Sequence, residues 1–250
     1  MNACSSRSVD LLNVAATCRL THALGPGPRA AVWVQGCPFD CAGCVAPDWI
    51  PDRPARLVAP AELAAGLCSA SGITGLTFSG GEPMSQAAGL AELVRCARAL
   101  RPDQDLSLVC FTGYRLEQLR RTPSNAGVVD LLAQIDVLVD GRYVASRDDN
   151  RGLRGSDNQR IHHLTDRLRA SGYDFEGRRR TTEIMIAGGE VLTVGMPAHG
   201  LLATLDEAKE RVRDVPSGRV RRTAGQRPVR VDRISRISRV DRPSLGRTDT

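Results

Sequence analysis

The sequence GCPFDCAGC, residues 36–44, brings three cysteines together in the spacing C-x3-C-x2-C. Three thiolates on one tight loop can hold three irons of a four-iron, four-sulfur cubane and leave the fourth iron open. The predicted cluster ligands are therefore Cys37, Cys41 and Cys44. The other five cysteines are scattered singly, a pattern typical of core thiols rather than of a second metal site.

Two other kinds of site also use cysteines at short spacing. A structural zinc ion takes four protein ligands, commonly from two cysteine pairs, and here only the adjacent His162 and His163 could complete the set. A redox CxxC motif made of Cys41 and Cys44 would leave Cys37 without a role. The spacing alone therefore indicates a metal or redox loop, and it favours the cluster.

A second motif, GGEP at residues 80–83, follows the apolar segment 75–79. Two glycines let the backbone approach a ligand closely, and a carboxylate beside them can accept hydrogen bonds from an ammonium group. The cysteine loop likewise follows an apolar segment rich in strand-forming residues, 30–35. Because each motif lies at the end of a predicted strand, the two together predict one shared site.

Strand-like and helix-like segments alternate over the first 140 residues, which indicates an α/β fold. We predict strands at 30–35, 75–79, 106–111 and 136–139, and helices at 60–70 and 85–100. Such a repeat favours a mostly parallel sheet whose ligands bind at the carboxyl ends of the strands. The segments 181–186 and 190–194 flank Ala-Gly-Gly, which predicts a β-hairpin.

The pair C-x3-C-x2-C and GGEP is the pattern of the radical S-adenosylmethionine (SAM) superfamily. Within it, the chain resembles the small proteins that activate anaerobic ribonucleoside-triphosphate reductase. The resemblance covers about residues 30–165 and rests on QGCPFDCAGC, TFSGGEPM, CFTGY, IDVLVDGRY and LRGSDNQRI, in that order. It implies an α/β fold of radical SAM type, an incomplete parallel β/α barrel to which the predicted C-terminal β-hairpin is added. The composition of the chain adds a disordered basic tail, which the activating proteins of this family do not carry.

The resemblance also implies the cofactors and the residues that bind them. The three cysteines would ligate one 4Fe–4S cluster, and SAM would bind at its open iron. The residues implied to contact SAM are Gly43, Gly80, Gly81 and Glu82. Asp140 is a candidate for a bond to the ribose or amino group of SAM and, equally, for a turn or capping aspartate. No residue is assigned as a catalytic group.

The implied activity is reductive cleavage of SAM to a 5′-deoxyadenosyl radical, which forms a glycyl radical on a partner enzyme. The electron donor would be a protein such as flavodoxin or ferredoxin. One departure from the family is the segment Val45-Ala46-Pro47, where the family has Asn-Pro. It keeps open a radical SAM enzyme that modifies a small molecule or peptide. A third hypothesis is a non-catalytic iron–sulfur or regulatory protein, against which the intact GGE sequence argues.

The charge is unevenly distributed along the chain. The 250 residues carry a net charge of +6, and residues 216–250 alone hold ten arginines and three aspartates. The rest is close to neutral, so contact with nucleic acid is expected only through this tail. The predicted organisation is a lead-in (1–29), a cluster domain (30–215) and a disordered tail (216–250). Neither a membrane span nor a signal peptide is recognisable, so we expect a cytoplasmic protein.

Overall fold

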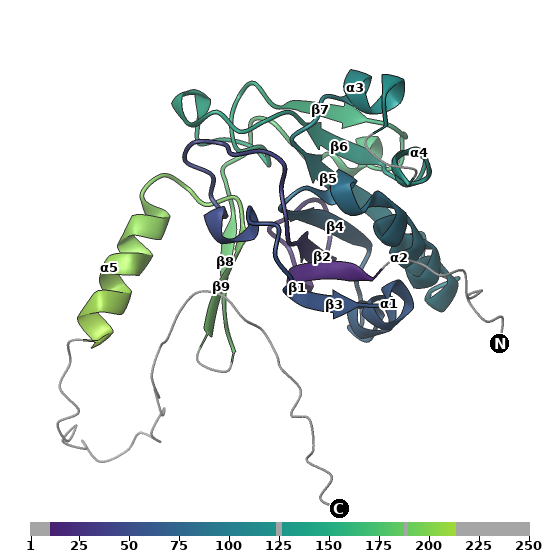
Figure 1. Cartoon of the computed structure of the whole chain (residues 1–250), viewed down its shortest axis with the longest axis horizontal. Coiled ribbons are helices and arrows are strands. Elements are labelled where there is room, and N and C mark those ends of the chain that lie inside the picture. Colours follow the sequence, from purple (N-terminus) through teal and green to yellow (C-terminus); the bar gives the residue numbers. More distant parts are fainter. Residues whose placement is uncertain (1–10, 124–126, 188–189, 214–250) are drawn as a thin grey trace, which may run out of the picture.

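The computed structural model describes residues 11–123, 127–187 and 190–213 (Figure 1). In this part of the chain, seven strands form one sheet in the order β3-β1-β2-β4-β5-β6-β7. A separate hairpin of β8 and β9 packs beside the sheet. The predicted disorder of residues 216–250 lies outside the described residues. None of the described helices has the length and apolar character of a membrane span.

The four central strands are parallel and match the four predicted strands closely. They are β2 (Arg29–Val34), β4 (Gly75–Gly80), β5 (Ser107–Thr112) and β6 (Val137–Asp140). Three further strands, all antiparallel to their neighbours, extend the sheet at its two sides. They are β1 (Leu12–Thr21), β3 (Arg56–Val58) and β7 (Arg160–His163). The sheet is therefore mixed, with a parallel centre.

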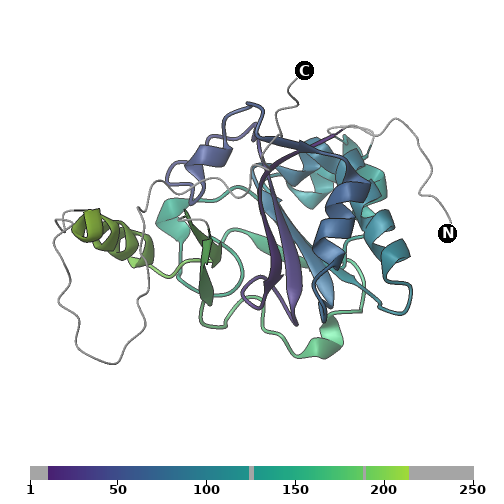
Figure 2. The same cartoon turned by 90° about the horizontal axis from the view of Figure 1, so that it is seen from below.

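Helices cover one face of the sheet, and the hairpin covers part of the other (Figure 2). The longer helices on the first face are α1 (Pro60–Cys68) and α2 (Ala87–Leu100), which pack against each other. Successive side chains of β2 point to opposite faces of the sheet. All of them are buried, because the sheet is covered on both faces at this strand. Val32 and Val34 join the core under the helices, while Trp33 joins a smaller core with Val194 of the hairpin.

The remaining elements are short or lie near the C-terminal end of the described chain. The helices are α3 (Leu116–Arg121), α4 (Val128–Leu132) and α5 (Leu201–Arg213), with 3-10 turns at Pro47–Trp49, Pro83–Gln86, Ala145–Arg147 and Arg169–Ser171. The hairpin strands are β8 (Thr182–Ala187) and β9 (Glu190–Gly195), which confirms the predicted hairpin. Helix α5 stands away from the sheet in both views (Figures 1 and 2).

Candidate functional site

The cysteine loop and the GGEP turn meet at the carboxyl ends of two paired strands. Strands β2 and β4 are parallel neighbours, and Val34 is opposite Gly80. Just beyond this pair, the Gly81 N–H donates to the Val34 carbonyl at 2.7 Å, and the Glu82 N–H donates to the Gly36 carbonyl at 2.8 Å. The sequence predicted that the two motifs form one shared site, and in the structure they are hydrogen-bonded to each other.

Both glycines of the GGEP turn are required by this close approach. Gly80 has φ of +101°, and a side chain there would come within 2.6 Å of the Val34 nitrogen. A side chain at Gly81 would overlap the Gly36 carbonyl. Any larger residue at either position would push the turn away from the cysteine loop.

Glu82 is a buried carboxylate that joins the ends of β4 and β5. Its Oε1 accepts hydrogen bonds from the Met84 N–H and the Thr112 hydroxyl, each at 2.8 Å, and its Oε2 accepts from the Gly113 N–H at 2.8 Å. Burial raises the pKa of Glu82 to about 7, although these three hydrogen bonds oppose the rise. Thr112 and Gly113, at the end of β5, thus contact Glu82 directly.

The three cysteines of the loop are free and only partly buried. Burial raises the pKa of Cys37 to about 11, opposed by the Phe39 N–H, and the neighbouring thiolates Cys41 and Cys44 add to the rise. In the described residues, no three His, Cys, Asp or Glu side chains converge closely enough to hold a single metal ion. Each thiolate of a cubane site binds a different iron, so the ligands stay farther apart.

The segment after the third cysteine is hydrogen-bonded to the start of the cysteine loop. The Gly36 N–H donates to the Trp49 carbonyl and the Cys37 N–H to the Ile50 carbonyl, both at 2.9 Å. The rings of Trp33 and Trp49 lie 5.9 Å apart between their centroids. The residues 45–47 that depart from the family pattern thus lead into a turn that holds the start of the loop.

The middle of the loop is held by an aromatic contact. The Phe39 ring lies edge-on to Tyr114, with 4.8 Å between the centroids, and the Arg142 guanidinium lies 4.4 Å from the Phe39 centroid. A side chain at Gly113 would overlap the Phe39 ring, so this glycine makes room for it. The ends of β5 and β6 therefore both contact the cysteine loop.

Asp140 lies at the end of β6 with no exposed surface. Its Oδ1 accepts from Arg115 at 3.1 Å, and its Oδ2 accepts from the Leu116 N–H at 2.7 Å and from Arg160 at 2.6 Å, with His162 2.9 Å away. Burial raises the pKa of Asp140, but the bonds from Arg160 and Leu116 outweigh it and bring the pKa to about 2. In this geometry, Asp140 caps the first turn of α3.

A family model of the 4Fe–4S single cluster domain matches residues 23–162, more than half of the chain. Over 147 residues, the chain is 34% identical to the anaerobic ribonucleoside-triphosphate reductase-activating protein of Enterobacteria phage T4, covering 57% of this chain and 88% of that protein. The protein of the same name from Vibrio cholerae is 36% identical over 149 residues, which cover 56% and 91%. The Escherichia coli K12 protein is 32% identical over 147 residues, which cover 56% and 91%.

The chain belongs to the anaerobic ribonucleoside-triphosphate reductase-activating protein family. The resemblance drawn from the sequence motifs is thereby confirmed. The part that matches the 4Fe–4S family model contains all the predicted site residues, from Cys37 to Asp140. The hairpin and α5 lie outside that part.

The sequence analysis of this family member did not predict several residues that hold the site together. Arg115 and Arg160 were not predicted to hold Asp140, and His162 faces Asp140 rather than a metal. Tyr143 was not singled out, although a side chain at Gly43 of the cysteine loop would lie 3.8 Å from its ring. These residues come from separate segments of the chain, and only the fold brings them together.

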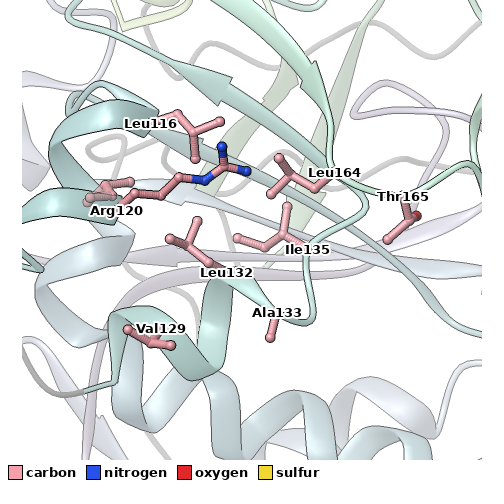
Figure 3. Close-up of a pocket in the computed structure, with 9 residues that line it drawn as sticks. Leu116, Arg120, Val129, Leu132, Ala133, Ile135, Leu164 and Thr165 are labelled. Atoms are coloured by element: carbon pink, nitrogen blue, oxygen red, sulfur yellow. The ribbon is translucent and has the colours of Figure 1, made fainter.

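An apolar hollow of about 360 Å³ lies at the outer side of the sheet, between α3, α4 and the segment after β7 (Figure 3). Leu116, Leu132 and Leu164 are among its lining residues, and the Arg120 guanidinium crosses it. None of the predicted site residues lines it. The hollow is therefore separate from the site formed by the cysteine loop and the GGEP turn.

Proposed function

We propose that this protein activates a partner enzyme by forming a glycyl radical on it, using one 4Fe–4S cluster and SAM. When bound, the cluster supplies the electron that cleaves SAM to methionine and a 5′-deoxyadenosyl radical, which takes the hydrogen atom from the partner's glycine. The observation that carries the proposal is the hydrogen bond from the Glu82 N–H to the Gly36 carbonyl. It joins the two motifs of the family into one site.

The residues of the site divide into two groups by their chemistry. Cys37, Cys41 and Cys44 would hold the cluster. Gly43, Gly80, Gly81 and Glu82 would surround SAM. A carboxylate has about four acceptor positions, and Glu82 uses three of them within the protein. The remaining acceptor capacity and the negative charge suit the ammonium group of SAM.

Asp140 fits the site in a different way. Its two oxygens already receive bonds from protein groups, so we propose that it orders the end of β6 and the start of α3. A direct contact between Asp140 and SAM stays a prediction. The test is SAM affinity in an Asp140→Asn variant.

The wider architecture supports the same proposal. We propose that the four parallel strands form part of an incomplete barrel of radical SAM type, because both motifs lie at their carboxyl ends. An incomplete barrel would leave the carboxyl ends of its strands accessible to the glycine-bearing segment of a partner. The curated relatives are named for activating anaerobic ribonucleoside-triphosphate reductase, so we propose such a reductase as the partner. The reductant would be a flavodoxin or ferredoxin in the cytoplasm.

The proposal is tested by anaerobic reconstitution with iron and sulfide. We expect the absorption spectrum of a 4Fe–4S cluster, and 5′-deoxyadenosine when the reduced protein meets SAM. A Cys41→Ala variant should lose both. The matched control is Cys68→Ala, since Cys68 is a buried thiol of α1 outside the loop. A protein that takes up zinc but no iron would contradict the proposal.

A second candidate function is the modification of a small molecule or peptide. The observation that favours it is the departure at residues 45–47, which lies directly after the cluster loop. The two functions separate in one experiment with a purified anaerobic reductase. Glycyl-radical activation predicts an EPR doublet on the reductase, and the alternative predicts SAM cleavage without it.

A further inference from the structure

The layer of helices over the sheet has a gap beside β7. Helices α3 and α4 connect β5 with β6 and pack over the sheet, where Leu119 shares a core with Leu138 of β6. Strand β7 is antiparallel to β6, and within the described residues a 3-10 turn follows it rather than a helix. The apolar hollow lies at this place, between Leu116 of α3, Leu132 of α4 and Leu164 after β7 (Figure 3). It thus occupies the position at which a further helix of the layer would pack.

The lining of the hollow combines apolar side chains with one unpaired cation. All the lining residues except Arg120 and Thr165 are apolar, and the Thr165 hydroxyl is already bonded to Asp136. The Arg120 guanidinium crosses the hollow (Figure 3), and in the part of the chain that the structure describes its side chain forms no hydrogen bond or ion pair. Val129, which also lines the hollow, is 61% exposed. The hollow therefore offers apolar surface and a free positive charge to another molecule.

This lining determines the chemistry of the molecule that fits. An unpaired guanidinium favours a carboxylate, with which it forms strong charge-assisted hydrogen bonds. An extended peptide would place its own N–H and C=O groups against leucine, isoleucine and valine side chains, which is costly. An α-helix bonds these groups internally and can present an apolar stripe to a groove. The occupant that fits is an amphipathic helix with an acidic residue beside its apolar stripe.

Helix α3 connects the hollow to the predicted cluster and SAM site. The Leu116 side chain lines the hollow, while the Leu116 N–H donates to Asp140 Oδ2 at 2.7 Å, at the end of β6. The hydroxyl of Thr112, at the end of β5, donates to Glu82. Because a helix of six residues is only about 9 Å long, a protein that contacts the far end of α3 can also reach the carboxyl ends of β5 and β6.

We propose that the apolar hollow is a docking site for the partner enzyme, and that it takes an amphipathic helix of the partner with an acidic residue paired to Arg120. The inference rests on the proposed function, which supplies the partner. Docking there adds a second contact area outside the site at which the partner's glycine reacts. It leaves the cysteine loop and the GGEP turn free for the cluster, SAM and the glycine-bearing segment.

The test measures binding to the purified anaerobic ribonucleoside-triphosphate reductase of the organism that encodes this chain. Arg120→Glu reverses the charge in the hollow, and Val129→Asp adds a charge to its apolar lining. Both side chains are exposed, so we expect the variants to fold. By calorimetry, Kd should rise at least about 10-fold in each, the usual effect of losing an interface anchor. Arg120→Lys should keep most of the affinity.

The matched control is Arg121→Glu, which reverses a neighbouring exposed charge of α3 outside the lining of the hollow. It should bind the reductase as the wild type does. Wild-type affinity in both Arg120→Glu and Val129→Asp would overturn the inference. An equal loss of affinity in Arg121→Glu and Arg120→Glu would also overturn it, since only general charge attraction would then be at work.

Activity separates failure of docking from failure of the proposed function. Without reductase, 5′-deoxyadenosine formation should be equal in the wild type and all these variants. With reductase, Arg120→Glu and Val129→Asp should raise the KM for the reductase and keep the yield of glycyl radical at saturation. If the wild type forms the radical and both variants show its KM, only the docking inference fails. If the wild type cleaves SAM but forms no radical on the reductase, the proposed function fails as well.

Two other occupants of the hollow would give different results, and either would overturn the docking of the partner there. If a second copy of this chain fills the hollow, sedimentation velocity should show a dimer that Val129→Asp converts to a monomer. If a small carboxylate fills it, decanoate should raise the unfolding temperature of the wild type and not that of Arg120→Glu. In both cases, reductase affinity would be the same in the variants and the wild type.

Discussion

Glu82 and Asp140 are both buried carboxylates near the carboxyl end of a parallel strand, but their surroundings differ in charge. Within the described residues, Glu82 accepts hydrogen bonds from neutral donors, the N–H groups of Met84 and Gly113 and the Thr112 hydroxyl. Among the described residues, no arginine, lysine or histidine forms an ion pair with it. Asp140, by contrast, is bonded by Arg115 and Arg160.

The pKa values follow this difference. Burial raises the pKa of both carboxyl groups, and it prevails at Glu82, which reaches about 7. At Asp140, bonds from Arg160 and Leu116 prevail, and the pKa falls to about 2. A buried carboxylate without a cation is costly unless a ligand supplies one. The comparison indicates that Glu82 is suited to a cationic ligand and that Asp140 is already paired within the protein.

The largest effect is expected where the two motifs touch. Gly81→Ala would force the GGEP turn away from the Gly36 carbonyl, so we expect a loss of about 3 kcal/mol in the free energy of unfolding. Cluster uptake should fall as well. Urea unfolding and iron analysis measure the two effects. The control is Gly66→Ala in α1, where a side chain meets nothing within 4 Å and should stabilise the helix by about 0.5–1 kcal/mol.

The next effect concerns the function of Glu82. Glu82→Gln keeps the size of the side chain but removes the negative charge that the ammonium group of SAM would meet, and its amide nitrogen can no longer accept one of the hydrogen bonds from the protein. We expect 5′-deoxyadenosine formation to fall about 10- to 100-fold, the usual worth of a hydrogen bond to a charged group. The control is Glu117→Gln, which removes an exposed carboxylate of α3. Equal activity in Glu82→Gln and the wild type would contradict the role of Glu82 as the partner of a cationic ligand.

A smaller effect is expected on stability at the other carboxylate. Asp140→Asn weakens the bonds from Arg115 and Arg160, whose side chains are 38% and 42% exposed and can turn to water. We therefore expect a loss of about 2 kcal/mol in unfolding free energy. SAM affinity, measured by calorimetry, should stay at the wild-type value. Loss of SAM binding with unchanged stability would instead support the direct contact that the sequence left open.

The smallest effect is a pair of opposite pH dependences in the cluster-free protein. The pKa of Glu82 is raised on folding, so its contribution to stability is lost as pH rises through about 7. The pKa of Asp140 is lowered, so its contribution is lost as pH falls from about 4 toward 2. Thermal unfolding across this range should show both slopes in the wild type. Glu82→Gln should lack the first slope and Asp140→Asn the second.

Much of this site could be predicted because its elements are local in sequence. The spacing of Cys37, Cys41 and Cys44 and the GGEP turn are each contained in a few residues, and each follows an apolar strand. The alternation of strand-like and helix-like segments then predicted the parallel centre of the sheet. The hairpin followed from two strand-like segments around Ala-Gly-Gly.

The parts that could not be predicted depend on contacts between distant segments. Strand β1 pairs antiparallel with β2 and β3, and β7 pairs antiparallel with β6, but neither pairing leaves a local pattern. The bonds that hold Asp140 could not be predicted, because one of its partners, Arg160, lies 20 positions away. The contact between the Arg142 guanidinium and the Phe39 ring is equally non-local.

The most direct test of a shared cluster and SAM site is the EPR spectrum of the reduced, reconstituted protein with and without SAM. If the GGEP turn and the cysteine loop form one site, SAM should change the cluster signal in the wild type and in Asp140→Asn at the same concentration, and in Glu82→Gln only at a concentration about 10- to 100-fold higher. A signal that SAM does not alter in the wild type, or that it alters equally in Glu82→Gln, would contradict the account.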